Sequence, residues 1–326
     1  MICDVHAHCT PGVVEAGLRE LEQVGTARQW YGRIVPPVSD SEADTDARLA
    51  LMDDAGVQVQ VLSQSVLPLL GNEAATVRLV QQANDALARM VARHPDRFLA
   101  YAELPLPYLD ASLREFERCR TELGFDVVNI LASCGTTSAV AEEFDPLYEE
   151  LDRRATVVFF HPRVTGLCSP LLNDYGLNAP LGPVFEDTLL VCQMVRRQFP
   201  QRFPNLKIII PHLGGVLPIY LPRMDNQMSL LFPELSERPS DTVRRLWFDT
   251  LAHGSVPALR SAHETLGVDR LVTGTDFPVM EHHDGYKASI DYIRHAGLPE
   301  ADVEQILHVN APRLFGLGAQ PVVNRR

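Results

Sequence analysis

Histidine side chains stand close together near the start of this chain, where a first strand is expected to end. His6 and His8 lie two residues apart in the segment Asp4-Val5-His6-Ala7-His8, which closes an apolar run. In an extended strand every second side chain shares a face, so both imidazoles could bind one cation. A His-x-His pair alone is weak evidence for a metal site, because the pattern also arises by chance.

Three later segments place a possible ligand or acid/base group in the same way, at the end of an apolar run. These runs lie near residues 157–160, 208–210 and 271–273, and the groups that follow them are His161, His212 and Asp276. Imidazole and carboxylate donors suit Zn²⁺ or Mn²⁺, and three or four protein ligands with one open position are typical of a catalytic metal site. Such a metal would polarise a bound water or a substrate oxygen.

The elements that must position these side chains alternate along the sequence between short apolar strands and helices. Strands are expected at residues 1–8, 57–62, 98–102, 126–130, 156–160, 206–210, 246–249 and 270–273. Several of the helices between them end at a glycine or before a proline, as at Gly56 and Pro95. This alternation predicts an α/β fold, a parallel eight-stranded (β/α)8 TIM barrel with long active-site loops after the strands.

We expect residues 1–326 to form one barrel domain with an irregular insertion at about residues 9–44. A doubly wound sheet is the alternative fold, but only a closed barrel makes the first and last strands neighbours and so brings His6 and Asp276 together. The insertion either faces the substrate or is a surface excursion. A second long connection, residues 163–183, is rich in glycine and proline and could cover the active site.

The composition is that of an ordinary globular protein. The 326 residues are 46% hydrophobic and 22% charged, and the formal net charge is -13. This acidic balance disfavours binding to nucleic acid or to an anionic membrane surface, since both rely on lysine and arginine.

No apolar run approaches the ~20 residues of a membrane span and the chain opens directly on a strand, so we expect a cytoplasmic protein. The six cysteines include no Cys-x-x-Cys pair, which indicates neither a thiolate zinc site nor a disulfide framework.

The motifs together resemble those of a known family. They are His6-x-His8, His161-Pro162, His212-x-Gly214-Gly215 and Gly274-Thr275-Asp276-Phe277-Pro278. The combination is similar to the amidohydrolase superfamily, and within it to the branch typified by aminocarboxymuconate-semialdehyde decarboxylase. The resemblance covers nearly the whole chain, because it extends to the stretches at residues 48–57, 94–98, 203–207 and 223–226.

The resemblance implies a role for individual residues. The mononuclear metal ligands of the family match His6, His8, His161 and Asp276. His212 matches the base that contacts metal-bound water. Binuclear members carry a bridging lysine at the end of the fourth strand, and residues 126–130 contain none, so one metal is expected. Hydroxybenzoate decarboxylases of this branch often replace the first histidine with glutamate, so His6 favours the aminocarboxymuconate-semialdehyde or 6-methylsalicylate type.

Four further residues are candidates for substrate binding. Arg33 falls near the position at which the family carries an arginine for a substrate carboxylate, and Arg223 matches an arginine that reaches into the neighbouring subunit's site. The latter implies a homodimer or a higher homo-oligomer. Arg163, just past His161, is interpreted either as a substrate contact or as a loop salt bridge, and Phe277 as a wall of the pocket. His282 and His283 could reach the pocket or face solvent.

The sequence therefore predicts a metal-dependent non-oxidative decarboxylase of an aromatic or enol-like carboxylic acid, of the hydroxybenzoate, salicylate or aminocarboxymuconate type. The expected cofactor is one divalent metal, with Zn²⁺ as first choice and Mn²⁺ as the alternative. An arginine would hold the carboxylate, while His212 with Asp276 would move a proton at the carbon that loses CO₂. A metal-dependent lactone or amide hydrolase, or a hydratase, is the second hypothesis, and a catalytically silent binding barrel is the third.

Overall fold

Parallel strands form the centre of the molecule in the computed structural model, which describes residues 1–20, 38–64, 72–163, 167 and 169–318. One sheet has the order β1 (Ile2–His8), β2 (Val57–Ser63) and β3 (Phe98–Ala100). The other has the order β11 (Leu271–Val272), β10 (Trp247–Asp249), β9 (Lys207–Ile210), β8 (Val157–His161), β5 (Val127–Leu131) and β4 (Ala102–Glu103). Only Tyr101 separates β3 from β4, and its backbone N–H donates to Leu62 O on β2, so the two pieces form one strand of the barrel.

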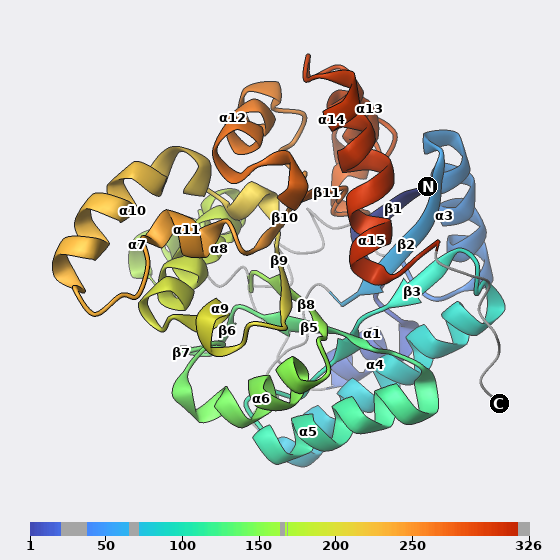
Figure 1. Cartoon of the computed structure of the whole chain (residues 1–326). Helices are drawn as coiled ribbons and strands as arrows, with labels where there is room; N and C mark the ends of the chain where they lie inside the picture. The colour runs from blue at the N-terminus through green and yellow to red at the C-terminus, as the bar shows by residue number, and fades with distance from the viewer. Residues whose placement is uncertain (21–37, 65–71, 164–166, 168, 319–326) are drawn as a thin grey trace.

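The first and last strands lie side by side, which closes the barrel. The Val5 N–H donates to Thr273 O at 2.9 Å, and Ala7 forms a parallel bridge with Phe277. The predicted (β/α)8 barrel is therefore confirmed, and the doubly wound sheet is excluded because its outer strands would not meet. Helices surround the strands on the outside (Figure 1).

The helices follow the strands with few exceptions. Their bounds are α1 (Gly12–Glu20), α3 (Glu42–Ala55), α4 (Glu73–Arg93), α5 (Leu109–Arg118), α6 (Asp145–Arg153), α7 (Pro170–Asn173), α8 (Asn178–Arg196), α9 (Phe199–Arg202), α10 (Leu217–Leu231), α11 (Pro239–Val243), α12 (Val256–Leu266), α13 (Ala288–Arg294), α14 (Glu300–Glu304) and α15 (Ala311–Phe315). Short 3-10 or π segments and a two-stranded hairpin, β6 (Ser133–Cys134) with β7 (Thr137–Ser138), complete the described chain.

Local sequence explains where α3 begins and ends. The Ser41 side chain accepts a hydrogen bond from Asp44 N and so caps the first turn. Gly56 ends the helix in a left-handed conformation, with φ at 72°, and β2 starts at the next residue. The helix begins at Glu42, because its polar first turn is held by this cap.

Some helices were not predicted, among them α1 and α10. The insertion at residues 9–44 contains α1 and the start of α3, while residues 21–37 lie outside the described part of the chain. The sequence predicts a helix at residues 184–199, and α8 begins earlier, at Asn178, before Pro183. The helix α10 runs through Pro222. Proline inside a helix removes a backbone donor and normally indicates a break, which is why the pattern placed the start of α8 too late and missed α10.

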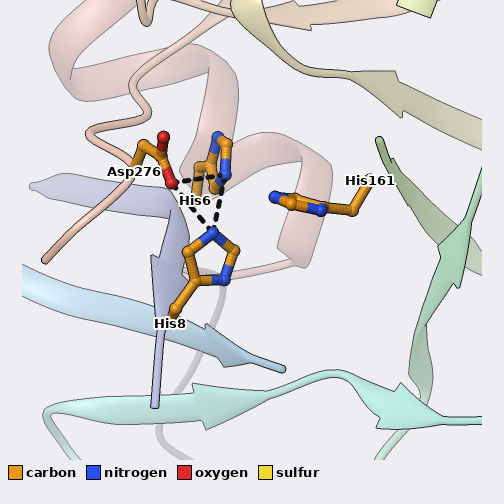
Figure 2. A group of neighbouring side chains, drawn as sticks. All are labelled: His6, His8, His161 and Asp276. Carbon is orange, nitrogen blue, oxygen red and sulfur yellow. Dashed lines mark hydrogen bonds and ion pairs between the residues drawn. The ribbon is translucent and has the colours of Figure 1, made fainter. Parts of the chain in front are cut away.

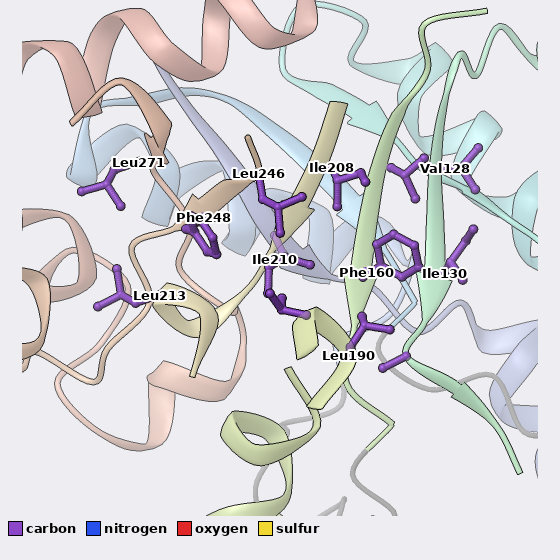
Figure 3. Close-up of a cluster of buried hydrophobic side chains, with 14 of the residues drawn as sticks. Val128, Ile130, Phe160, Leu190, Ile208, Ile210, Leu213, Leu246, Phe248 and Leu271 are labelled. Atoms are coloured by element: carbon purple, nitrogen blue, oxygen red, sulfur yellow. The ribbon is translucent and has the colours of Figure 1, made fainter. Parts of the chain in front are cut away.

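Apolar side chains fill the barrel on two faces. Along β8, Val157 and Phe159 pack inside the barrel, whereas Val158 and Phe160 pack outward against the helices. This is the alternation that a strand imposes on successive residues. Figure 3 shows part of the outer cluster, in which side chains of β5, β8 and β9 lie beside Leu190 of α8. His161 continues the inward-facing set at the carboxyl end of β8, so the barrel itself aims this imidazole at the site.

None of the helices in the part of the chain that the structure describes is long and apolar enough to cross a membrane.

Candidate active site

Four side chains converge where the strands end (Figure 2): His6 and His8 on β1, His161 on β8, and Asp276 in the loop after β11. One donor atom from each lies within 4.8 Å of the others. The distance between His6 Nε2 and His8 Nε2 is 3.1 Å, and Asp276 Oδ1 lies 2.9 Å from His8 Nε2 and 3.3 Å from His6 Nε2. All four residues are buried. The sequence-predicted ligand set is thus brought together by the fold.

The second ring nitrogen of each histidine is held from outside the cluster. His6 Nδ1 lies 2.6 Å from Asp249 Oδ2, His8 Nδ1 lies 3.0 Å from Ser63 Oγ, and His161 Nδ1 donates to Pro162 O at 2.7 Å. Because these partners occupy Nδ1, each imidazole turns Nε2 towards the other ligands. Three oriented imidazoles and one carboxylate are a donor set that fits a divalent metal ion.

Burial and neighbouring charges set the protonation of the cluster. Burial, together with the nearby imidazoles of His8 and His6, keeps the pKa of His161 well below its usual value. Burial also opposes the charged form of His6, but the carboxylates of Asp276 and Asp249 outweigh it and raise the pKa of His6 to about 9. A divalent cation bound among these ligands would compete with that proton, which is why metal binding to such sites depends on pH.

His212 stands next to the four ligands, after β9. Its Nε2 lies 3.9 Å from Asp276 Oδ2, and its backbone N–H donates to Asp249 Oδ1 at 2.8 Å. Its Nδ1 lies 2.8 Å from Asp187 Oδ2 on α8. Burial disfavours a charged His212, but the carboxylate of Asp187 outweighs it and raises the pKa of His212 well above its usual value. The imidazole can therefore hold a proton beside Asp276.

Two glycines let the supporting elements approach closely. A Cβ atom on Gly215 would lie 2.0 Å from the carbonyl oxygen of Val184 in α8, so this helix rests directly on the glycine backbone. A Cβ atom on Gly274 would lie 2.7 Å from the Cβ of Asp249 and 3.0 Å from that of His6. Both positions need glycine for space, and Gly215 also has a φ of 67°.

Sequence reasoning missed the acidic partners of the site. Asp249 ends β10 and contacts both His6 and His212, and it had the same signal as the predicted ligands, an acidic residue after an apolar strand. Asp187 had no such signal because it lies inside a helix, 25 residues before the histidine that it contacts. A search for polar residues at strand ends therefore finds the candidate ligands and misses a carboxylate carried by a helix.

The structure describes three of the four predicted substrate-binding residues. Arg33 lies outside the described residues, and Arg223 is exposed on α10. Arg163 is half-buried just after β8. The Phe277 ring is buried between Tyr286, at 5.4 Å between ring centroids, and the Arg48 guanidinium, at 4.5 Å from the ring centroid. A substrate-binding role for these residues stays a prediction.

His282 and His283 are both exposed. The ring of His283 lies 5.5 Å from that of His253, in an edge-on arrangement.

Comparison with known proteins identifies the family. The family model described as Amidohydrolase matches residues 3–317. The chain belongs to the amidohydrolase family. This amidohydrolase is 28% identical to 2-amino-3-carboxymuconate-6-semialdehyde decarboxylase of Dictyostelium discoideum, over 76% of this chain and 70% of the relative. It is also 28% identical to 2-keto-4-carboxy-3-hexenedioate hydratase of Sphingobium sp., over 97% of this chain and 96% of the relative.

A solved structure extends the comparison to the fold. The crystal structure of 5-carboxyvanillate decarboxylase from Sphingomonas paucimobilis superposes with a TM-score of 0.84 at 26% identity, over 97% of this chain and 98% of the other. The resemblance drawn from the sequence motifs is therefore confirmed, and so is the barrel fold.

Proposed function

We propose that this amidohydrolase is a metal-dependent non-oxidative decarboxylase of an aromatic or enol-like carboxylic acid. The observation that carries the proposal is the single buried cluster of His6, His8, His161 and Asp276 with His212 beside it. No other group of three or more histidine, cysteine or acidic side chains lies as close together in the described ranges. The names of the decarboxylase relative and of the decarboxylase structure support the same reaction class.

The metal, when bound by the four ligands, would act as a Lewis acid that orients the substrate and polarises its oxygens. His212 would carry the proton of the reaction, because Asp187 holds its Nδ1 and leaves Nε2 facing the site. When the bond between the carboxyl carbon and the substrate breaks, CO₂ leaves and the electron pair stays on the substrate carbon. His212 would protonate that carbon, and the conjugated system spreads the charge until it does.

Asp276 would stay ionised throughout. Burial opposes its charge, but the neighbouring imidazoles of His6 and His212 outweigh burial and keep the pKa of Asp276 well below its usual value. The carboxylate can therefore serve as a ligand and stabilise a protonated His212 at the same time.

Zn²⁺ is our first choice for the metal and Mn²⁺ the alternative. Imidazole nitrogen and carboxylate oxygen suit both ions, and no cysteine belongs to the described cluster. The cation held in the cell is decided by availability as much as by the donor set.

We further propose a homodimer or higher homo-oligomer in which Arg223 contributes to a neighbouring site. Support comes from large apolar side chains that are exposed on α8 and on α10, and α10 is the helix that carries Arg223. On α8 these are Phe185 (40% exposed) and Leu189 (45%), and on α10 they are Ile219 (78%), Leu230 (75%) and Leu231 (65%). Exposed apolar side chains gathered on neighbouring elements mark interaction surfaces. A second copy of this chain would cover them.

A hydratase is the second candidate, because the hydratase relative matches this chain over nearly its whole length. In that reaction the same metal and His212 would add water across a conjugated double bond, and no CO₂ would leave. A lactone or amide hydrolase would use the same ligands, but neither of the named relatives nor the named structure suggests it.

Metal analysis of the purified protein, followed by assays of CO₂ release, tests the proposal. The metal-loaded protein is incubated with hydroxybenzoates, aminobenzoates and muconate-type acids. About one Zn²⁺ or Mn²⁺ per chain and CO₂ from at least one acid are expected. Bound metal with hydration of an unsaturated acid, and no CO₂ from any of them, would move the assignment to the second candidate.

A further inference from the structure

A pocket opens beside the metal ligands, on the wall formed by β4 and β5. Its polar lining consists of Thr76, Glu103, Asn129, Ser133, Cys134 and Arg163, and the side chains around these are apolar. Neither the family resemblance nor the metal cluster assigns a task to Glu103 or Asn129.

Strand register places this pocket next to the metal site. Glu103 is paired with Asn129, and Asn129 with Phe159, which lies two residues before His161 on β8. The ring of Phe159 is 4.9 Å from that of His6. Side chains in paired positions of neighbouring parallel strands share one face, so Glu103 and Asn129 line the barrel one layer beneath His161.

A second link runs through β2. Ser63, which contacts His8 Nδ1, is followed by Gln64, whose backbone N–H donates to Glu103 Oε1 at 2.7 Å. Two consecutive residues, Ser63 and Gln64, therefore hold His8 and Glu103, which ties the pocket wall to the metal site.

Asn129 presents an unused acceptor. Its Nδ2 donates to Gln64 O at 3.1 Å and to Glu103 Oε2 at 2.9 Å, and because a carbonyl oxygen needs a donor, Gln64 O fixes the orientation of the amide. Its Oδ1 is buried and has no hydrogen-bond partner among the described residues, although Asn129 is only 2% exposed. Buried polar atoms are almost always paired, so an atom without a partner on a pocket wall indicates a place for a ligand donor.

The charge of the pocket suits an acid. Burial raises the pKa of Glu103 to about 8, so its carboxyl group is mostly protonated at neutral pH. The guanidinium of Arg163 forms no ion pair with an acidic side chain in the ranges that the structure covers. With Glu103 mostly neutral, Arg163 is the charged side chain of the pocket lining, so the pocket has a positive balance.

We propose that this pocket is a subsite for a second polar substituent of the substrate, a ring hydroxyl or amino group remote from the carboxyl group that is lost. The substituent donates to Asn129 Oδ1, and Arg163 attracts the anionic acid. The inference rests on the proposed function and narrows its substrates to acids that carry such a donor. An acid with a methyl group in that place leaves the buried acceptor unpaired and binds more weakly.

Calorimetry with matched probes tests this on the metal-loaded protein. The probes form two pairs of salicylates. One pair carries either a hydroxyl or a methyl group para to the carboxyl group. The other pair carries either group at the position meta to the carboxyl group and para to the phenol hydroxyl. The wild-type protein should bind the hydroxyl form of at least one pair about 10-fold more tightly. Equal affinities within both pairs, or no binding of any probe, would overturn the subsite, with no variant needed.

Variants then assign the residues. Asn129→Leu, of similar shape, should lose the preference for hydroxyl while it still binds the methyl probe, and Asn173→Leu, on exposed α7, is the matched control that should keep it. Arg163→Met should weaken both members of a pair by similar factors. A preference that survives in Asn129→Leu would refute the assignment. Because binding is measured and CO₂ release is assayed separately, a clear preference together with no CO₂ from any acid of the full panel would sink the decarboxylase proposal and leave the subsite standing.

Discussion

The carboxylate of Asp187 lies 2.8 Å from Nδ1 of His212 and is 1% exposed, in a pair formed between α8 and the loop after β9. The pair exists because α8 rests on the bare backbone of Gly215. A carboxylate that holds Nδ1 of a histidine fixes both the tautomer and the direction of Nε2. His212 thus receives its orientation from a helix rather than from the strand that precedes it.

Replacing Asp187 with Asn should lower kcat by about 10²- to 10⁴-fold and leave the metal content unchanged, because the acid/base group loses its orientation and charge partner. Steady-state kinetics and metal analysis on the same preparation measure both. Asp174→Asn, at an exposed position, is the matched control and should behave like the wild type. A loss of metal in Asp187→Asn would show that the residue supports the ligands instead.

Metal ligands and the acid/base residue should separate by their metal content. His6→Ala and Asp276→Ala should reduce metal occupancy, since each removes a donor from the cluster. His212→Ala should keep the metal and lose turnover. Retained turnover in His212→Ala would remove it from the mechanism.

Asp249 should govern metal affinity through His6, whose Nδ1 it contacts at 2.6 Å. Asp249→Asn should weaken metal binding by about 10- to 100-fold, the usual effect of losing the partner of a metal-bound histidine. Competition with a chelator of known affinity measures this. Unchanged affinity in a folded variant would mean that other contacts suffice to orient His6.

Subunits that lack different groups should complement each other if Arg223 serves a neighbouring site. A mixture of Arg223→Ala and His212→Ala protein should regain part of the activity that each lacks, because one mixed site then has both groups. Subunit exchange is checked with mass-labelled chains. Full exchange without recovered activity would place the action of Arg223 within its own chain.

Stability should fall between about pH 5 and pH 8 through Glu103, whose pKa burial raises from 4.5 to about 8. Below pH 4.5 the carboxyl group is protonated in both the folded and the unfolded chain, and above pH 8 the folded chain must bury a charge. The loss is about 1.4 kcal/mol for each pH unit in this window. Glu103→Gln, which stays neutral, should not show this part of the slope, and denaturant unfolding at several pH values measures the difference. Parallel profiles for the two proteins would contradict the assignment.

The sequence predicted which side chains gather in the buried cluster because their positions follow from the fold. Each of His6, His8 and His161 lies at or near the end of an apolar strand, Asp276 follows one closely, and a barrel gathers such ends in one place. The order of strands and helices could be predicted from the sequence as well, because apolar residues recur with the period of the element whose face they bury.

What could not be predicted depends on contacts between elements. Asp187 faces His212 only because α8 docks on Gly215, and the orphaned oxygen of Asn129 is defined by what its neighbours leave unsatisfied. The helix α10 was missed because Pro222 interrupts its pattern and Ile219 and Leu230 are exposed rather than buried. No local pattern carries information of this kind.

The closure of the barrel has a consequence for biosynthesis. Thr275 N, next to Asp276 of the buried cluster, donates to Asp4 Oδ1 across a sequence separation of 271 residues, so the cluster forms between segments that are far apart in the sequence. During translation His6 and His8 leave the ribosome long before Asp276, and a nascent chain holds only part of the site. Contacts this distant in sequence form late and slowly. We therefore expect metal uptake to coincide with completion of the barrel, which would make bound metal a marker of a finished molecule.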